Sequence, residues 1–120
     1  MAKYTARLRG NFTKFLGRVE KGILEGSISA TLEGGTDYKM SEVKCSIRVF
    51  ERYSFSGGNR VSLSLMLFGS DDVFRLTAIT SGGSTVKLFK INTIGEEAFL
   101  SELVDIVKEY EGSQKYEQQY

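Results

Sequence analysis

The sequence predicts an α+β protein in which an antiparallel meander sheet of about six strands packs on a carboxy-terminal helix, a helix-grip-like arrangement. Three observations predict this class. Apolar and polar residues alternate in six segments, which is the period of half-buried strands. Most connections between these segments are short, and such loops join antiparallel neighbours. The last segment instead has apolar residues at helical spacing, and this stripe needs a sheet face to cover it.

The expected elements are one strand, one helix, five strands and one helix. The first strand covers residues 3–9, with Tyr4, Ala6 and Leu8 facing the core. Asn11 then caps a helix that ends at Gly26. The remaining strands are expected in the alternating segments 28–32, 43–49, 61–67, 74–78 and 86–89.

The sequence contains no proline, so the turns of the meander are assigned to glycine pairs and their neighbours. The segment 34–41 is expected to be a loop. In the strand that follows it, the apolar set is assigned to the core and the set with Lys44, Arg48, Phe50 and Arg52 to the opposite face; the core set comprises Val43, Cys45, Ile47 and Val49.

The last helix is predicted from a capping box, in which Thr93 is the cap and Glu96 stands three residues later. Its apolar stripe runs from Phe99 to Tyr110, and Gly112 is expected to end it. Residues 1–112 are therefore expected to form a single domain, followed by a polar, frayed tail at 113–120.

The composition excludes several kinds of site. The 120 residues include no histidine, which rules out a Ser-His-Asp triad and a histidine-ligated metal. Cys45 is the only cysteine, and a single thiol fits a reducing cytoplasm. No apolar run is long enough to span a membrane, and the amino terminus lacks the apolar segment of a signal peptide. We therefore expect a cytoplasmic protein without a metal, a cofactor or a membrane partner.

A small-molecule site is the first functional hypothesis. If the core-facing alternation of the strand at 43–49 continues, Glu51 and Tyr53 follow on the inner face, and Thr80 does so on a neighbouring strand. Polar groups would then replace apolar ones where two Ser-Gly-Gly turns meet, as in many ligand sites. The alternative is a wet sheet rim, because one bulge would reverse the alternation. The candidate ligand-binding residues are Glu51, Tyr53, Gly57, Gly58, Asn59, Thr80, Ser81, Gly82 and Gly83.

The opposite sheet face is the second candidate surface, because basic and aromatic residues are interleaved on it. Its exposed phenylalanines and methionines fit a homo-oligomer interface. A face partly covered by the first helix, a solvated face and a weak polyanion site are the alternatives, although the near-neutral net charge of +1 argues against nucleic acid. The candidate interaction residues are Arg48, Phe50, Arg52, Arg75, Lys87 and Phe89.

An enzyme is the least favoured function. General acid–base catalysis without histidine would require a partly buried carboxylate, and Glu51 is the only carboxylate whose position in the sequence suggests burial.

Several segments together resemble the family of bacterial proteins catalogued as domain of unknown function 6054. The resemblance extends over nearly the whole chain, to about Tyr110. It implies a bacterial, cytoplasmic protein and assigns no catalytic residues. The segments that carry it are 3–4, 8–12, 49–54, 58–63, 78–84, 89–93, 95–97 and 99–100.

Overall fold

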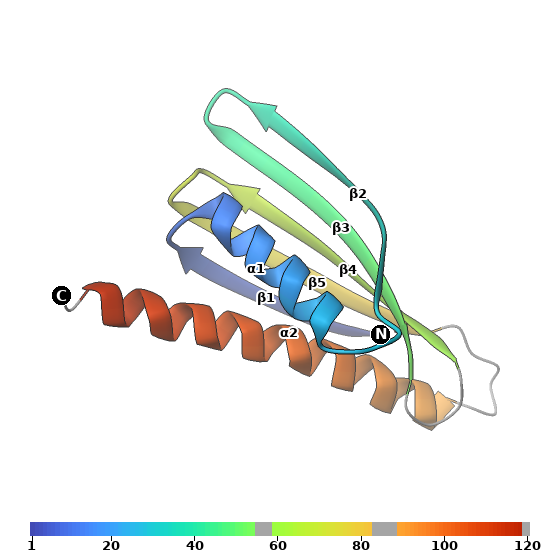
Figure 1. The fold of residues 1–120 in the computed structure, drawn as a ribbon. Helices are drawn as coiled ribbons and strands as arrows, with labels where there is room; N and C mark the ends of the chain where they lie inside the picture. The colour runs from blue at the N-terminus through green and yellow to red at the C-terminus, as the bar shows by residue number, and fades with distance from the viewer. Residues whose placement is uncertain (55–58, 83–88, 119–120) are drawn as a thin grey trace.

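The computed structural model describes residues 1–54, 59–82 and 89–118, of which 89–94 and 115–118 are described by their backbone only (Figure 1). The architecture is α+β, as predicted, and the described residues form five strands rather than six. Residues 86–88 of the sixth expected strand lie outside the described ranges, and Phe89 is the first residue of a helix. The elements are β1 (Ala2–Arg9), α1 (Phe12–Glu25), β2 (Thr31–Met40), β3 (Val43–Tyr53), β4 (Arg60–Gly69), β5 (Val73–Gly82) and α2 (Phe89–Gln118).

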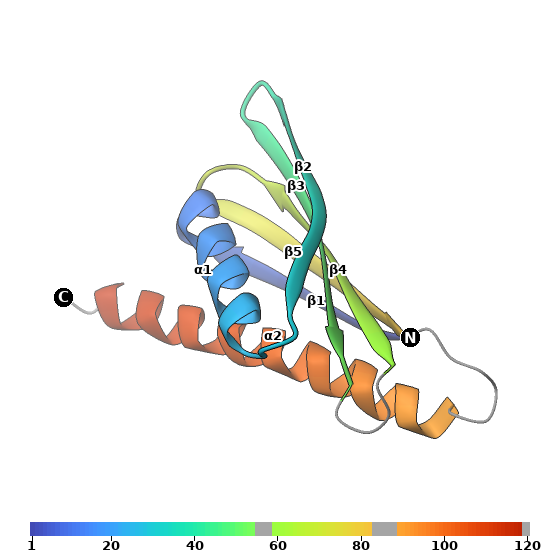
Figure 2. The same ribbon diagram turned by 45° about the vertical axis from the view of Figure 1, so that its right-hand side comes forward.

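All strand pairs are antiparallel, and the order across the sheet is β1-β5-β4-β3-β2. The strands β2 to β5 form the expected meander, and β1 extends it by pairing with β5. Both helices lie on the same face of this sheet, which leaves the other face uncovered by the described chain (Figures 1 and 2). The helix α2 contacts β1, β4 and β5, whereas α1 packs beside α2 and approaches β2.

The core lies between the two helices and β1, β5 and β4. The rings of Phe12 and Phe15 from α1 each lie 5.5 Å from the ring of Phe74 on β5. The alternation predicted for β1, β4 and β5 is confirmed, because Leu8, Leu63 and Leu76 are buried. Since Leu63 and Leu103 of α2 belong to one buried cluster, the predicted packing of the last helix on the sheet is also confirmed.

The face assignment predicted for β3 is wrong. Phe50 is fully buried and Arg52 is 6% exposed, whereas Val43 and Tyr53 are exposed. The register between β3 and β4 explains this reversal, because Phe50 pairs with Leu63 and neighbouring residues across a sheet share a face. The predicted core set of β3 therefore lies on the uncovered face.

The strand β2 also differs from its prediction. Ile28 is fully exposed before the strand begins, and the expected loop at 34–41 is mostly strand, with an irregularity in pairing between Leu32 and Gly34. Gly35 has a packing role there. A Cβ at this position would lie 2.8 Å from both the Ile47 carbonyl oxygen and the Cδ of Arg48.

The ends of α1 are as predicted, since the Asn11 side chain accepts a hydrogen bond from the Lys14 amide and Gly26 is the C-cap. The predicted ends of α2 are wrong. The helix starts at Phe89, so Thr93 lies inside it, and it continues through Gly112 to Gln118. A Cβ on Gly112 would meet no atom within 4 Å, so packing does not require glycine there.

Candidate functional site

Among the described residues, Glu51 and Tyr53 do not lie on the same side of the sheet as Thr80, although the three were predicted to converge beside the Ser-Gly-Gly turns. Thr80 is fully buried and its hydroxyl donates to the Glu96 carbonyl oxygen at 3.1 Å. Glu51 and Tyr53 lie on the opposite face, where the Glu51 carboxylate pairs with Arg60 at 2.5 Å. The convergence of Glu51, Tyr53 and Thr80 is therefore a wrong prediction.

The remaining candidates at that end are only partly described. The Gly82 amide donates to the Glu96 carboxylate at 2.9 Å, and the Ser81 carbonyl accepts from Ser62. The carbonyl of Asn59 accepts from the Ser54 amide, which closes the β3–β4 connection. Gly57, Gly58 and Gly83 lie outside the described residues.

The predicted interaction face is divided between the two sides of the sheet. Arg48, Phe50 and Arg52 point toward the helices, which contradicts the prediction, and Arg75 points away from them as predicted. Lys87 lies outside the described residues, and Phe89 belongs to α2 rather than to a strand.

Arg52 of β3 contacts two side chains of α2. Its guanidinium pairs with the Glu102 carboxylate and lies 4.4 Å from the centre of the Phe99 ring. Burial raises the pKa of Glu102, and the positive charge of Arg52 opposes that rise. The arginine predicted to lie on an interaction surface is thus part of the interior.

We call the sheet surface opposite the helices the open face. An apolar patch occupies it over β2, β3 and β4, because side chains paired across these strands stack in rows. Phe68 is 47% exposed and Met66 is 40% exposed. The patch consists of Tyr38, Cys45 and Phe68 in one row, Ile47 and Met66 in the next, and Val49 with nearby Ile79 in a third.

Charges on the open face are segregated by strand. The β1–β5 side carries only basic residues, and Arg7 lies directly opposite Arg75 in the register. The β2–β3 side carries Glu33 and Glu51, and Arg60 of the neighbouring β4 lies 3.6 Å from the Glu33 carboxylate and 2.5 Å from the Glu51 carboxylate. The basic set comprises Lys3, Arg7, Arg9 and Arg75.

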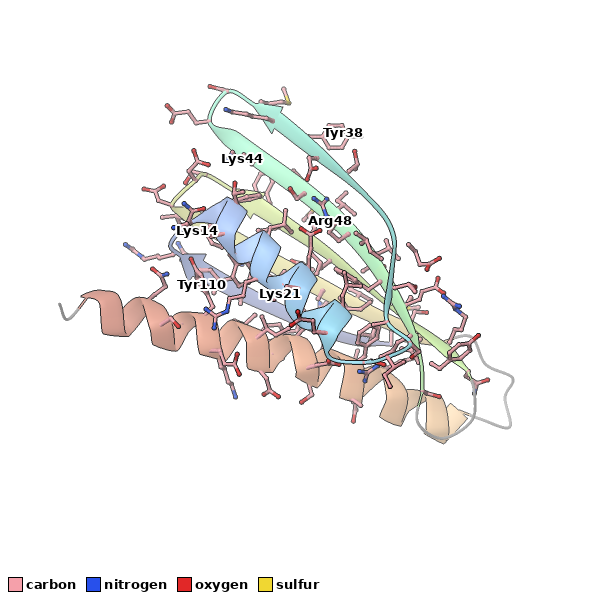
Figure 3. The ribbon with its side chains drawn as sticks, viewed as in Figure 1. Lys14, Lys21, Tyr38, Lys44, Arg48 and Tyr110 are labelled. Atoms are coloured by element: carbon pink, nitrogen blue, oxygen red, sulfur yellow. The ribbon has the colours of Figure 1, made fainter. Side chains whose placement is uncertain are left out.

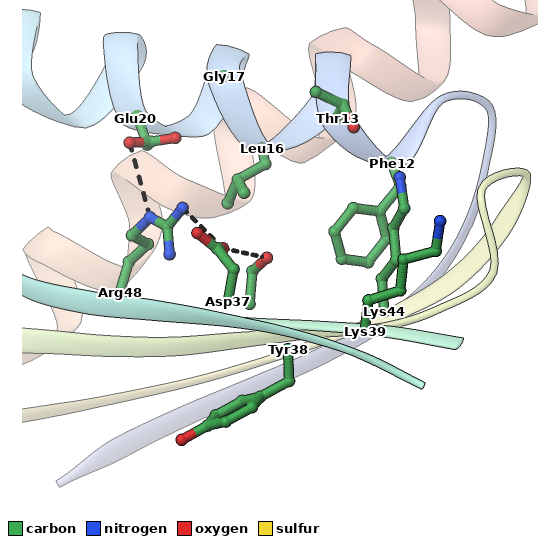
Figure 4. A pocket seen from close by; sticks show the side chains of 11 residues that line it. Phe12, Thr13, Leu16, Gly17, Glu20, Asp37, Tyr38, Lys39, Lys44 and Arg48 are labelled. Atoms are coloured by element: carbon green, nitrogen blue, oxygen red, sulfur yellow. Dashed lines mark hydrogen bonds and ion pairs between the residues drawn. The ribbon is translucent and has the colours of Figure 1, made fainter. Parts of the chain in front are cut away.

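A cleft of about 480 Å³ lies on the helix side, between α1 and the β2–β3 hairpin (Figure 4). From α1 it is lined by Phe12, Leu16 and Gly17, which give it an apolar wall. Lys39 and Lys44, which pair across the two strands, stand at one end of it. The Tyr38 side chain points away from the cleft, to the other side of the sheet.

Arg48 bridges the two walls of the cleft. Its guanidinium lies 3.6 Å from the Glu20 carboxylate of α1 and 2.9 Å from the Asp37 carboxylate of β2. Figure 3 shows Arg48 on the side of the sheet that faces α1. The Ser46 hydroxyl donates to Asp37 at 2.6 Å, and this bond, together with Arg48, lowers the pKa of Asp37. The bridge fixes the hairpin relative to the helix.

Sequence reasoning missed this cleft because Asp37 and Lys39 were expected in a loop and Lys44 and Arg48 on the other face. The sequence offered one signal for the cleft, because Gly17 and Gly22 weaken the helix. In the structure a Cβ at Gly17 would meet no atom within 4 Å, so packing does not explain the glycine at this position.

Within the described ranges, no group of three or more acidic or cysteine side chains is close enough to hold a metal ion. No described helix is long and apolar enough to cross a membrane.

The comparisons with known proteins identify the family. Residues 1–111 match the family described as "Family of unknown function (DUF6054)", and the chain belongs to this family. A search of curated proteins gives no match. The expected resemblance is confirmed, and the family description assigns no activity.

Proposed function

We propose that this chain is a non-catalytic interaction protein of the reducing cytoplasm that forms a homodimer through its open face. The observation that carries the proposal is the apolar patch on a sheet face that the described helices leave uncovered. Exposed contiguous apolar patches on soluble proteins mark interaction sites. The free thiol of Cys45 within the patch fits a reducing environment.

The open face is large enough for a stable dimer. The strands β4 and β5 each have ten residues, and the sheet has five strands. At the usual rise and strand spacing this face measures about 33 Å by about 20 Å. Two such faces in contact bury roughly 1,300 Å², which lies within the range of specific protein interfaces.

The charges on the open face favour a second copy as the partner. A two-fold axis parallel to the strands and passing through β4 places β1 of one copy over β2 of the other, because β4 is the central strand. Lys3 then lies opposite Gly34 of β2, beside the partner's Glu33, and Arg7 lies over the partner's Tyr38. The basic β1–β5 side of each copy thus covers the side of the other that carries Glu33, Glu51 and their partner Arg60, with the apolar patches between them.

The same geometry weakens the case for the alternative functions. A polyanion site on this face would lack Arg48 and Arg52, which lie on the helix side. A ligand site at the Ser-Gly-Gly turns would lack Glu51 and Tyr53 on its inner wall.

Sedimentation analysis of the full chain tests the dimer. We expect a dimer at concentrations of about 100 μM, because interfaces of this size bind at micromolar affinity or tighter. Met66→Glu, in the centre of the patch, should give a monomer with an unchanged circular dichroism spectrum. Leu24→Glu is the matched control, because Leu24 has a similar exposure of 37% on α1 and should leave the dimer intact.

Charge reversal tests the orientation of the two copies. Lys3→Glu and Glu33→Lys should each weaken the dimer, and the double variant should restore it. Labelling of Cys45 should slow as protein concentration rises. A wild-type monomer at about 100 μM, or a dimer unaffected by Met66→Glu, contradicts the proposal.

A further inference from the structure

The cleft between α1 and the β2–β3 hairpin lies on the other side of the sheet from the open face and has its own chemistry. We propose that this cleft binds a small amphiphilic oxyanion, with the anionic head between Lys39 and Lys44 and the apolar body along Leu16 and Gly17. The site is independent of the dimer, because its lining side chains face the helices.

The two lysines supply the first argument. Lys39 and Lys44 are direct cross-strand partners, and like charges in this position repel each other. Lys44 pairs with the 75%-exposed Asp71 at 2.5 Å, and Lys39 makes no ion pair among the described residues. An exposed pair with Asp71 contributes little, so both ammonium groups are available to an oxyanion that relieves their repulsion.

The acidic groups of the cleft do not cancel this charge. Asp37 accepts from Ser46 and pairs with Arg48, and Glu20 lies against the same guanidinium. Among the side chains that line the cleft, Arg48 and the two lysines carry three positive charges and Glu20 and Asp37 carry two negative ones, so the lining has a net charge of +1. A head group with negative charge is therefore the complementary ligand, in the form of a carboxylate or a phosphate.

Gly17 supplies a second, independent argument. It is exposed in the interior of α1, where glycine costs about 1 kcal/mol relative to alanine. A Cβ there would meet no atom within 4 Å, so packing against the core or α2 does not require a glycine at this position. Gly17 lines the cleft beside Leu16, where a larger side chain would occupy the volume that a ligand needs.

The dimensions limit the apolar body. The lining of α1 extends from Phe12 to Glu20, a length of about 12 Å at the usual helical rise. The bridge from Glu20 to Arg48 closes the end away from the lysines (Figure 4). The volume of about 480 Å³ lies within the range of small-molecule pockets. A chain of medium length fits this space better than a long acyl chain.

Titration calorimetry with four eight-carbon probes tests the site. Octanoate and octyl phosphate should bind, and octanol and octylammonium should bind at least about tenfold more weakly. Amide shifts in NMR should cluster at residues 12–20, 37–39 and 44–48. The ratio of the affinities for octanoate and octyl phosphate distinguishes a carboxylate site from a phosphate site.

Variants locate the binding in the cleft. Gly17→Leu should abolish octanoate binding, and Gly112→Leu is the matched control because its position in α2 is also empty. Lys39→Gln with Lys44→Gln should weaken binding about tenfold or more without lowering the melting temperature. Met66→Glu, on the open face, should leave binding unchanged.

Two kinds of result would overturn the site. Equal binding of octylammonium and octanoate would show that the lysines do not select the head group. Octanoate binding that survives Gly17→Leu, or that is lost in Met66→Glu, would place the ligand outside the cleft. Neither result would bear on the dimer, which sedimentation measures without a ligand.

Discussion

Replacing Gly17 with alanine is expected to stabilise this protein. The Cβ would meet no atom within 4 Å, so the substitution adds no clash. The helical propensity alone then changes the free energy of unfolding, by about 0.8–1 kcal/mol in favour of alanine. For a chain of 120 residues this raises the melting temperature by about 3–4 °C.

The same substitution at Gly10 is expected to have the opposite sign. Gly10 has a φ of +136°, which a residue with a side chain rarely adopts, and its Cβ would overlap the Tyr110 hydroxyl. That hydroxyl accepts a hydrogen bond from the Asn11 amide at 2.9 Å and lies beside the start of α1 (Figure 3). Backbone strain and the disturbed hydrogen bond together should cost about 2–4 kcal/mol.

Urea unfolding followed by circular dichroism measures both effects. Gly17→Ala should raise the midpoint without changing the slope, and Gly10→Ala should lower it. Gly112→Ala is the control, since it changes an equally empty position far from the cleft and should match Gly17→Ala. A destabilised Gly17→Ala would show that α1 packs more closely than its geometry indicates, and the reasoning about the cleft wall would fail.

Two carboxylates should give pH dependences of opposite sign. Ser46 and Arg48 lower the pKa of Asp37, so the stability that Asp37 contributes is complete above its ordinary pKa and is lost as the pH falls through the folded value. In urea unfolding at different pH values, Asp37→Asn should therefore lose less stability toward acid pH than the wild type does. The pKa of Glu102 is raised, first by burial, so its contribution is complete below the ordinary pKa and is lost as the pH rises through the folded value. The stability of the wild type relative to Glu102→Gln should therefore increase toward acid pH, and a decrease would contradict the assignment.

Local sequence patterns were sufficient to predict the helices and strands whose apolar side chains face the core directly. The capping group of Asn11 and the apolar stripe of α1 are adjacent in the sequence, so the helix was predicted with its ends. In β1, β4 and β5 the buried set is also the more apolar set, and the alternation alone identified the core face.

The strand β3 shows what alternation leaves undetermined. It correctly separates Cys45 and Ile47 from Ser46 and Arg48, and it does not say which set faces the helices. The hairpin register decides this, because Arg52 pairs with Val61, and a shift of one residue would exchange the two faces. Residues 55–58 of that connection include the pair Gly57-Gly58, which predicts a turn but does not specify which residues of the two strands pair.

The start of α2 was misplaced for a different reason. Thr93 and Glu96 satisfy a capping-box pattern, yet Glu96 uses its carboxylate to accept from the Gly82 amide at the end of β5. Glu96 therefore makes a contact with a distant strand in place of the capping-box contact with Thr93. Such a contact joins residues that are distant along the chain, so a local pattern could not distinguish a cap from a position inside the helix.

The register of β3 creates both surfaces at once. Because neighbouring residues of a strand face opposite sides, placing Lys44, Ser46 and Arg48 in the cleft places Cys45 and Ile47 on the open face. The cleft can hold these polar groups because α2 packs over β1, β4 and β5 and α1 only approaches β2, so that the β2–β3 hairpin extends beyond the core. Gly35 then lets Arg48 lie beneath β2, where it bridges to α1. The charged wall of the cleft and the apolar patch are thus two consequences of one strand pairing.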